Sequence, residues 1–509
     1  MNIATLLRRS ASDHPARVAL RLDDTEVTYA GYAEEGGRFA TFLRASGVEP
    51  GERVGFFLPN CLEYLPGMLG VWQAGAVAVP LNYLFPDAAL RHAVGDSGAR
   101  YLVVLPGDVA RLTDVLGDAL PELLTLGPDG SYSAALAAHE PAADVTPRVD
   151  GDDALLMYTS GSTGVPKGVR QTHRNTTAHC EAVIDLYEID GSDHVLNCMP
   201  LFHVGGLQLA SLTVLLRAGQ ITFMPRWDPL RWLELAQTLR PTYGGLISTM
   251  MMDVGNRTVG SPVVLDSFRI CMFGGSRSPS AAIERLEAGT GIKGTEIYGQ
   301  TEQSGLVISY APGDPRRPDS MGRPLEQIVH TRLVSPDTGE DVPSGSDGAD
   351  GGSARSDAVG ELWVRGDAVT PGYWGIEASE RWSDGWFHTG DLMSRDGDGY
   401  LYYIDRIDDM IVSGGENVFP QMVEEHLAGH PDLAEVAVIG TAHERWVEQV
   451  TAVVVPNRDG VTADDVAAWC AEHPNLRGIA RPRRVEIVEE LPRTGSGKLN
   501  RPELRKKFP

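Results

Sequence analysis

The segment best suited to chemistry follows a short apolar run of strand type, Ala154 to Tyr158. Its glycines let the backbone bend and approach a ligand closely, its hydroxyl groups donate hydrogen bonds, and one lysine adds a compact positive charge. Because a flexible Gly/Ser linker would not be anchored by an apolar strand, we predict a polyphosphate site instead. The predicted phosphate contacts are Thr159, Ser160, Gly161, Ser162, Thr163, Gly164 and Lys167.

Two other kinds of nucleotide loop are excluded by their context. A Walker A loop requires Ser or Thr directly after Gly-Lys, whereas Lys167 is followed by Gly168. The pattern G-x-G-x-x-G occurs at residues 289–294, but it follows a predicted helix and precedes a predicted strand. A dinucleotide fingerprint has the opposite order, so we interpret residues 289–294 as a helix end and a turn.

The loop at residues 158–168 resembles the phosphate-binding motif of the adenylate-forming superfamily. That superfamily comprises acyl-CoA synthetases, aryl-CoA ligases, luciferases and the adenylation domains of peptide synthetases. Further resemblances follow in the family's order over nearly the whole chain. The intact segment at residues 413–420 is similar to the acyl-CoA synthetase and CoA ligase branch.

The resemblance implies a site for ATP and Mg²⁺. The segment Glu296 to Glu302 resembles the family's adenine and magnesium motif, in which Tyr298 would stack on adenine and Glu302 would bind the metal. Mg²⁺ is a hard cation that prefers carboxylate and phosphate oxygens. Thr301 would meet the α-phosphate. The nucleotide contacts implied here are Gly275, Ser276, Tyr298, Gly299, Gln300 and Thr301.

Three later segments, at residues 386–391, 405–420 and 492–498, complete the resemblance. Asp391 would accept hydrogen bonds from the ribose, and Arg406 would contact ribose or phosphate. Asp408 would be the hinge residue of a mobile C-terminal domain. Lys498, in Pro-Arg-Thr-Gly-Ser-Gly-Lys, would bridge the attacking carboxylate and the α-phosphate. The residues implied for CoA are Ser413, Gly414 and Gly415.

The acyl pocket is the least explicit part of the sequence. His203 stands where amino-acid-activating relatives place an aspartate, so an amino-acid substrate is disfavoured. The methionines at 250 and 251 suit a hydrophobic or bulky acid, although they are equally ordinary core residues. The implied pocket residues are His203, Ser248, Met250, Met251 and Gly274, and the implied catalytic residues are Lys498, Glu302, Thr159 and His203.

The resemblance implies two reactions at one site. ATP and a carboxylic acid would form an acyl-adenylate and pyrophosphate, and CoA would then take the acyl group as a thioester. Three alternatives remain open: transfer to the phosphopantetheine of a carrier protein, a luciferase-like oxygenase, and a nucleotide sensor without catalysis.

Alternating helical and strand patterns must position these residues. Examples are helices at Tyr29 to Leu43 and Leu62 to Gly75 and a strand at Arg53 to Leu58. The pattern indicates an α/β fold of layered sheets. We expect a large N-terminal domain over residues 1–404 and a small, mobile α+β C-terminal domain over residues 405–509. Residues 343–358 are of low complexity and are interpreted as a solvated hairpin insertion.

Composition limits the remaining classes of function. The net charge of −25 over 509 residues disfavours binding to nucleic acids or anionic membranes. Five scattered cysteines form no zinc or disulfide pattern, and the first residues lack an apolar signal segment. The uncharged run Leu65 to Phe85 is broken by glycine and proline, so we predict a buried helix and strand instead of a membrane span. We therefore expect a cytoplasmic monomer or homodimer.

Overall fold

The computed structural model describes residues 1–160, 165–275, 280–345, 356, 358–377, 379–414, 416–493 and 499–509. These residues form two compact units. Unit 1 comprises Met1–Arg316, Gly322–His330 and Arg365–Gly385, and unit 2 comprises Arg317–Met321, Thr331–Val364 and Trp386–Pro509. The expected boundary between residues 404 and 405 is a different division of the chain, and it remains a prediction.

A seven-stranded sheet in unit 1 carries the phosphate segment. Its strand order is β18-β8-β7-β4-β3-β5-β6, and β7, β4, β3, β5 and β6 run parallel. The strands are β3 (Arg53–Phe57), β4 (Val77–Pro80), β5 (Tyr101–Val104), β6 (Glu122–Thr125), β7 (Asp153–Ser160), β8 (Pro166–Thr172) and β18 (Gly372–Tyr373). The crossover helices are α3 (Tyr64–Gln73), α4 (Asp87–Ser97) and α5 (Val109–Leu116).

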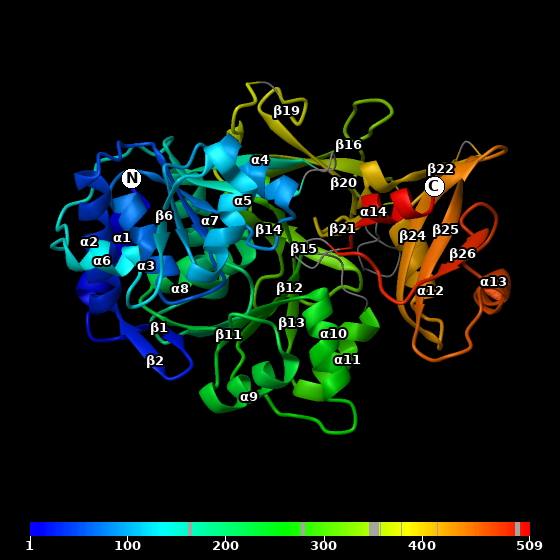
Figure 1. Cartoon of the computed structure of the whole chain (residues 1–509). Coiled ribbons are helices and arrows are strands. Elements are labelled where there is room, and N and C mark those ends of the chain that lie inside the picture. Colours follow the sequence, from blue (N-terminus) through cyan, green and yellow to red (C-terminus); the bar gives the residue numbers. More distant parts are fainter. Residues whose placement is uncertain are drawn as a thin grey trace. The chain divides into compact units, whose positions relative to one another are not determined.

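Strands β4 and β5 are buried on both faces of this sheet, which explains why they are apolar throughout. Successive side chains of a strand point to opposite faces. Phe56 stacks on Tyr64 of α3, whereas Phe57 packs in a core cluster with Leu90 of α4 and Leu112 of α5. Helices α1 (Ile3–Asp13), α2 (Tyr29–Ala45) and α6 (Ser131–Ala137) lie together with α3 in the blue and cyan part of Figure 1.

A second sheet in unit 1 has the strand order β14-β13-β12-β11-β9-β10-β1-β2. Its strands are β1 (Val18–Leu22), β2 (Thr25–Thr28), β9 (His194–Asn197), β10 (Gln220–Phe223), β11 (Tyr243–Ile247), β12 (Ile270–Gly274), β13 (Gly294–Gln300) and β14 (Gly305–Ser309). All but β2 and β14 are parallel. The associated helices are α7 (His173–Tyr187), α8 (Thr213–Leu216), α9 (Pro229–Leu239), α10 (Ser248–Arg257) and α11 (Ser280–Thr290).

Unit 2 contains a group of antiparallel strands and a smaller α+β part. The order of the first group is β16-β17-β20-β21, formed by β16 (His330–Val334), β17 (Gly360–Arg365), β20 (Trp386–Arg395) and β21 (Leu401–Arg406). The smaller part has the order β23-β22-β25-β24, with β26 on β25. It consists of β22 (Ile411–Ser413), β23 (Glu416–Val418), β24 (Leu433–His443), β25 (Val447–Pro456), β26 (Arg484–Ile487), α12 (Pro420–Leu427), α13 (Ala463–Glu472) and α14 (Arg501–Lys507).

The structure confirms several of the predicted elements. The run Leu65 to Phe85 contains the buried helix α3 and the buried strand β4, and within the described ranges no helix is long and apolar enough to cross a bilayer. Residues 289–294 join the end of α11 to the start of β13, as predicted for a helix end and a turn. Strands β16 and β17 flank the low-complexity insertion, most of which lies outside the described residues.

The buried carboxyl group of Glu35 in α2 should make the stability of the fold depend on pH. Burial, assisted by the charge of Glu63, raises the pKa of Glu35 to about 7, although the Tyr132 hydroxyl donates a hydrogen bond to it at 3.1 Å. Between pH 4.5 and 7 the unfolded chain releases this proton while the folded chain retains it, so stability falls as pH rises. Glu35→Gln removes this cost, because its amide oxygen still accepts from Tyr132.

We therefore expect Glu35→Gln to increase the free energy of unfolding at pH 8 by up to about 3 kcal/mol, and so to raise the thermal unfolding midpoint. Near pH 4 the midpoint should be unchanged. The neighbouring Glu34→Gln is the matched control, because the Glu34 side chain is 56% exposed. Equal effects of the two substitutions at every pH would contradict the assignment to Glu35.

Candidate functional site

The described ends of the phosphate segment belong to the antiparallel strand pair β7–β8. The pairing register places Thr159 opposite Lys167 and Ser160 opposite Pro166. The hairpin therefore brings a hydroxyl residue and the lysine to the same end of the two strands. The predicted contacts Gly161, Ser162, Thr163 and Gly164 lie outside the described residues, as does the Ser160 side chain.

The backbone on either side of Lys167 is fixed by hydrogen bonds. The Nε2 atom of His92 lies 3.0 Å from the Pro166 carbonyl oxygen, and the Trp374 amide donates to the Gly168 carbonyl at 2.7 Å. In β7, the Tyr158 hydroxyl donates to Asp96 of α4 at 2.6 Å. Burial raises the pKa of Tyr158, so this hydroxyl keeps its proton. The lysine therefore extends from a backbone held from both sides.

The ammonium group of Lys167 contacts an aromatic ring. Its Nζ atom lies 5.2 Å from the centroid of the Tyr373 ring, at a distance typical of a cation–π contact. In the part of the chain that the structure describes, no carboxylate forms an ion pair with this lysine. An ammonium group without a carboxylate partner is well suited to bind phosphate oxygens.

The predicted adenine and magnesium motif forms the end of β13 and the single turn Thr301–Gln303 that precedes β14. Tyr298 is 8% exposed, and the side-chain Nε2 atom of Gln300 lies 3.5 Å from the Tyr298 hydroxyl. A side chain at Gly299 would come within 1.6 Å of the Gly305 carbonyl oxygen, so only glycine fits in this tight hairpin. Glu302 therefore lies in the turn of a tight hairpin formed by β13 and β14.

Glu302 is held at both its backbone and its side chain. Its carbonyl accepts from the Thr370 amide at 3.0 Å, and its Oε1 atom accepts from the Tyr373 hydroxyl at 2.8 Å. Among the described residues no cation pairs with this carboxylate, and no group of three or more potential ligands could hold a metal by itself. A single carboxylate fits Mg²⁺ that arrives on a nucleotide, because phosphates and water complete its octahedron.

A buried amide links the phosphate hairpin to this motif. Gln171 of β8 is fully buried, and its Nε2 atom donates to the Thr301 carbonyl at 2.9 Å. Its Oε1 atom accepts from Gln208, which lies in the π-helix Gly205–Leu212 just after His203. π-Helical turns occur frequently at functional sites. The three predicted parts of unit 1 are thus joined by hydrogen bonds through its interior.

The loop that carries His203 is fixed by two buried asparagines. Asn60 donates to the Met199 carbonyl and accepts from the Leu201 amide, both at 3.0 Å. Asn197 accepts from the Met199 amide at 3.0 Å. The His203 ring is half-buried, and its Nδ1 atom accepts from the Gly205 amide at 3.3 Å. The histidine therefore has a defined position, while its catalytic role remains a prediction.

The other predicted acyl-pocket residues lie at the ends of parallel strands. Ser248 begins α10 directly after β11, and Gly274 is the last residue of β12. Met250 and Met251 are buried in a core cluster with Leu246. Gly275 is exposed with φ at +87°, whereas Ser276 lies outside the described residues. Strand ends of this kind are common ligand positions in α/β sheets.

In unit 2, the two predicted ribose residues are partners. Asp391 of β20 and Arg406 of β21 face each other in the register, and an ion pair of 3.2 Å joins them. Asp391 is 3% exposed, so the arginine compensates for its buried charge. Asp408, the predicted hinge residue, lies in the turn Ile407–Asp409, and its side chain is 53% exposed.

The predicted CoA segment lies beside a tryptophan that we had not singled out. Ser413 ends β22 and is 1% exposed, while Gly415 lies outside the described residues. Gly414 has φ at +62°, its amide donates to the Trp446 carbonyl at 2.9 Å, and a side chain there would collide with the indole. The guanidinium carbons of Arg445 and Arg483 lie 4.8 and 4.9 Å from the Trp446 ring centroid. This surface is therefore aromatic and cationic.

Lys498 lies outside the described residues, but both flanks of its segment are described. Arg493 and Leu499 form an antiparallel bridge, and α14 follows. Arg501 of α14 binds both carboxylate oxygens of Glu424 at 2.7 Å, and Arg505 donates to the Asp408 carbonyl at 3.4 Å. The predicted lysine segment thus precedes a helix that is attached to the predicted hinge turn.

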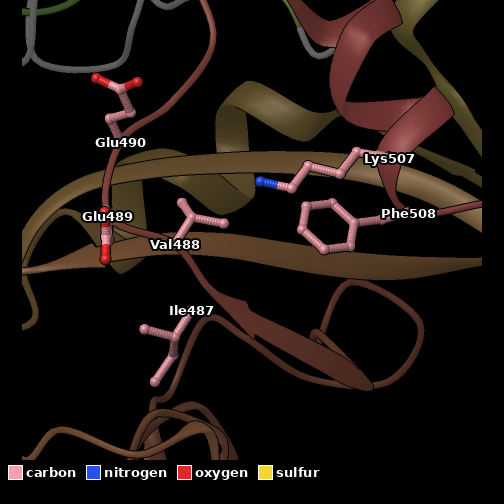
Figure 2. A pocket seen from close by; sticks show the side chains of 6 residues that line it. All are labelled: Ile487, Val488, Glu489, Glu490, Lys507 and Phe508. Carbon is pink, nitrogen blue, oxygen red and sulfur yellow. The ribbon is translucent and has the colours of Figure 1, made fainter.

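A hollow of about 420 Å³ in unit 2 contains none of the predicted site residues. Figure 2 shows that it lies between the chain after β26 and the end of α14, with the side chains of Lys507 and Phe508 close together. The lining residues are Ile487, Val488, Glu489, Glu490, Lys507 and Phe508.

Two residues of the site were missed in the sequence. Tyr373 lies 71 positions from Glu302, in a two-residue strand without periodicity, and its only signal is the Gly-Tyr-Trp sequence at 372–374. Trp446 follows Arg445 in a polar turn between β24 and β25. An adjacent Arg-Trp pair in a polar turn is the signal that could have indicated a binding surface.

Comparison with known proteins agrees with this geometry. Residues 7–374 match the family described as AMP-binding enzyme, and residues 422–498 match the AMP-binding enzyme C-terminal domain. A feruloyl-CoA synthase of Amycolatopsis sp is 36% identical and aligns over 98% of both chains. An indoleacetate–CoA ligase of Aromatoleum aromaticum is 32% identical over 99% of this chain and 98% of its own.

Among solved structures, ATP-bound MatB from Rhodopseudomonas palustris superimposes with a TM-score of 0.90 at 28% identity, over 100% of this chain and 99% of that one. These similarities confirm the predicted fold class and the predicted activity, AMP-forming acyl-CoA synthesis through an acyl-adenylate, with ATP and CoA as substrates. Transfer to a carrier protein is less supported. The chain belongs to the AMP-binding enzyme family, in the acyl-CoA synthetase branch of the adenylate-forming superfamily.

Proposed function

We propose that this acyl-CoA synthetase activates a hydrophobic carboxylic acid that carries a ring, and that Lys167 and Glu302 hold the triphosphate and its Mg²⁺. The roles proposed for Lys167 and Glu302 rest on one observation. Neighbouring elements of unit 1 present an ammonium and a carboxylate that have no ion-pair partners among the described residues. Opposite charges kept available in this way suit a ligand that is itself an anion bound to a cation.

The two charged side chains have different roles in adenylation. Lys167, with the hydroxyl of Thr159 opposite it, binds the β- and γ-phosphates. Glu302 orients the metal, which when bound neutralises phosphate charge as a hard Lewis acid. A carboxylate oxygen of the substrate attacks the α-phosphorus, and the bond from phosphorus to the oxygen that bridges to the β-phosphate breaks. Pyrophosphate leaves, and Lys498 stabilises the two anions as they meet.

Thioester formation uses the predicted C-terminal segments. The thiol sulfur attacks the acyl carbonyl carbon, the bond from that carbon to the AMP oxygen breaks, and the thiol proton is released to solvent. Asp408 is proposed as the hinge between residues 1–404 and 405–509, with Asp391 and Arg406 on the ribose. Gly414 would line the passage of the pantetheine arm beside Trp446, where the close approach of the indole leaves no space for a side chain.

The surface beside Gly414 favours CoA over a carrier protein as the acceptor. CoA carries an adenosine and two phosphate groups that a carrier-bound phosphopantetheine lacks, because the carrier-bound arm keeps only the phosphate attached to pantetheine. Trp446 offers a ring for stacking, and Arg445 and Arg483 offer positive charge beside it. An aromatic ring with two guanidinium groups matches a nucleotide with phosphates.

The nature of the acid is supported by the pocket and by two relatives. Feruloyl and indoleacetate, the acyl groups named for these relatives, both carry an aromatic ring. In this chain Met250 and Met251 follow β11 in an apolar environment, and apolar, adaptable side chains suit a ring.

A pyrophosphate-release screen tests the proposal. The panel contains ferulate, indoleacetate, a long-chain fatty acid and acetate, each with and without CoA. We expect release with the ring-bearing acids and a product thioester only when CoA is present. Release with acetate alone, or with none of these acids, would contradict the proposed substrate class.

Lys498→Ala should abolish adenylation but spare the second reaction. We expect acid-dependent ATP–pyrophosphate exchange to fall by at least about 100-fold, because a charge that stabilises the transition state is lost. Thioester formation from a preformed acyl-adenylate should be retained. Lys506→Ala is the control, because this exposed lysine lies in the same terminal segment. Unchanged exchange in Lys498→Ala would disprove the assigned role.

The double variant Arg445→Ala with Arg483→Ala should weaken the use of CoA specifically. We expect KM for CoA to rise by about tenfold, from the loss of two contacts to phosphate or base, with adenylation unchanged. Pantetheine provides the comparison, because it has the thiol without the nucleotide. If both thiols are affected equally, these arginines do not recognise the nucleotide part of CoA.

A further inference from the structure

Tyr373 lies between the two charged residues of the proposed phosphate site. It belongs to the two-residue strand β18, which pairs antiparallel with β8 through Tyr373 and Val169. Val169 is two positions from Lys167 on β8, so the chain segment that carries the tyrosine runs beside the one that carries the lysine. The tyrosine is 5% exposed.

The hydroxyl group of Tyr373 is hydrogen-bonded to the carboxylate of Glu302. It donates to Oε1 of Glu302 at 2.8 Å. An ionised carboxylate accepts hydrogen bonds on both oxygens. A donor on Oε1 fixes the plane of the group and leaves Oε2 as the oxygen that can bind a cation.

The ring of Tyr373 contacts the ammonium group of Lys167. The Nζ atom of Lys167 lies 5.2 Å from the ring centroid, where the negative face of an aromatic ring attracts a cation. Trp382 packs edge-on against the same ring at 5.0 Å. The Trp382 indole donates to the Thr370 carbonyl at 3.0 Å, and the Thr370 amide donates to Glu302. The ring therefore cannot turn without breaking contacts on several sides.

One phenol thus satisfies an anion and a cation with different parts of its surface. A carboxylate and an ammonium on adjoining elements attract each other, and direct pairing would occupy both groups. Because the hydroxyl holds one and the ring face holds the other, the two charges are stabilised without an ion pair between them.

We propose that Tyr373 is a positioning residue that keeps Lys167 and Glu302 apart and available for Mg²⁺-bound ATP. This inference rests on the proposed function of those two residues. The two parts of the tyrosine have different roles. The hydroxyl orients Glu302 for binding the metal, and the ring positions Lys167 for binding the phosphates.

Two substitutions and a binding measurement test it. Tyr373→Phe removes only the hydroxyl, and Tyr373→Leu removes the ring as well. Binding of α,β-methylene-ATP, which cannot transfer its adenylyl group, is measured by calorimetry over a range of Mg²⁺ concentrations. The thermal unfolding midpoint is recorded for every variant. Tyr187→Phe is the matched control, because it removes another buried tyrosine hydrogen bond, 2.7 Å to Ser309, elsewhere in unit 1.

For Tyr373→Phe we expect the Mg²⁺ concentration at half-saturation to rise by about tenfold, with analogue affinity at saturating Mg²⁺ within about threefold of wild type. For Tyr373→Leu we expect the same Mg²⁺ shift and an additional loss of affinity of about fivefold at saturating Mg²⁺. Tyr187→Phe should lower the unfolding midpoint without changing the Mg²⁺ dependence.

A wild-type Mg²⁺ dependence in Tyr373→Phe, or an equal shift in Tyr187→Phe, would overturn the inference while leaving the proposed function intact. If the wild-type protein failed to bind the analogue at any Mg²⁺ concentration, the proposed role of Lys167 and Glu302 would itself be wrong. The two failures are therefore distinguishable by the behaviour of the wild type.

Discussion

The site in unit 1 depends on keeping two opposite charges close without letting them neutralise each other. Lys167 and Glu302 come from different sheets, yet Tyr373 contacts both, and no ion pair forms with either among the described residues. Much of the surrounding fold serves this arrangement. His92 and Trp374 fix the backbone of the lysine, and the tight hairpin at Gly299 fixes that of the glutamate. This arrangement supports the proposed binding of a polyphosphate with a bound cation.

Unit 2 handles its charges in a different way. There the buried carboxylate of Asp391 is paired with Arg406 across two strands, and α14 is attached to the turn that contains Asp408. An aspartate oriented by an arginine suits neutral ribose hydroxyls, which need acceptors more than they need net charge. The aromatic and cationic surface at Trp446 is the feature that we propose for recognition of a thiol that carries a nucleotide. The proposed half-reactions thus draw on chemically distinct surfaces of one chain.

The sequence was most informative where an element is long and apolar. Helix α2 and strand β3 lie where their periodicity predicted them, and the interrupted run after Leu65 is a helix and a strand because glycine and proline divide it. The resemblance of the motifs predicted roles for Lys167, Glu302 and Asp391, and these roles remain predictions. It did not reveal that Asp391 and Arg406 are partners, since this follows from strand register. Tyr373 was beyond prediction because a two-residue edge strand has no period, and its contacts are distant in sequence. The identity of the acid depends on side-chain packing that no motif encodes.

Lys167 and Glu302 are proposed to hold the nucleotide and its metal, with Tyr373 positioning both side chains. The most direct measurement is a crystal structure of the protein with Mg²⁺ and α,β-methylene-ATP. We expect Nζ of Lys167 within hydrogen-bond distance of β- or γ-phosphate oxygens, one Glu302 oxygen on the metal, and the other still bonded to Tyr373. A nucleotide bound away from the β7–β8 hairpin, or Lys167 paired directly with Glu302 in the complex, would contradict the account.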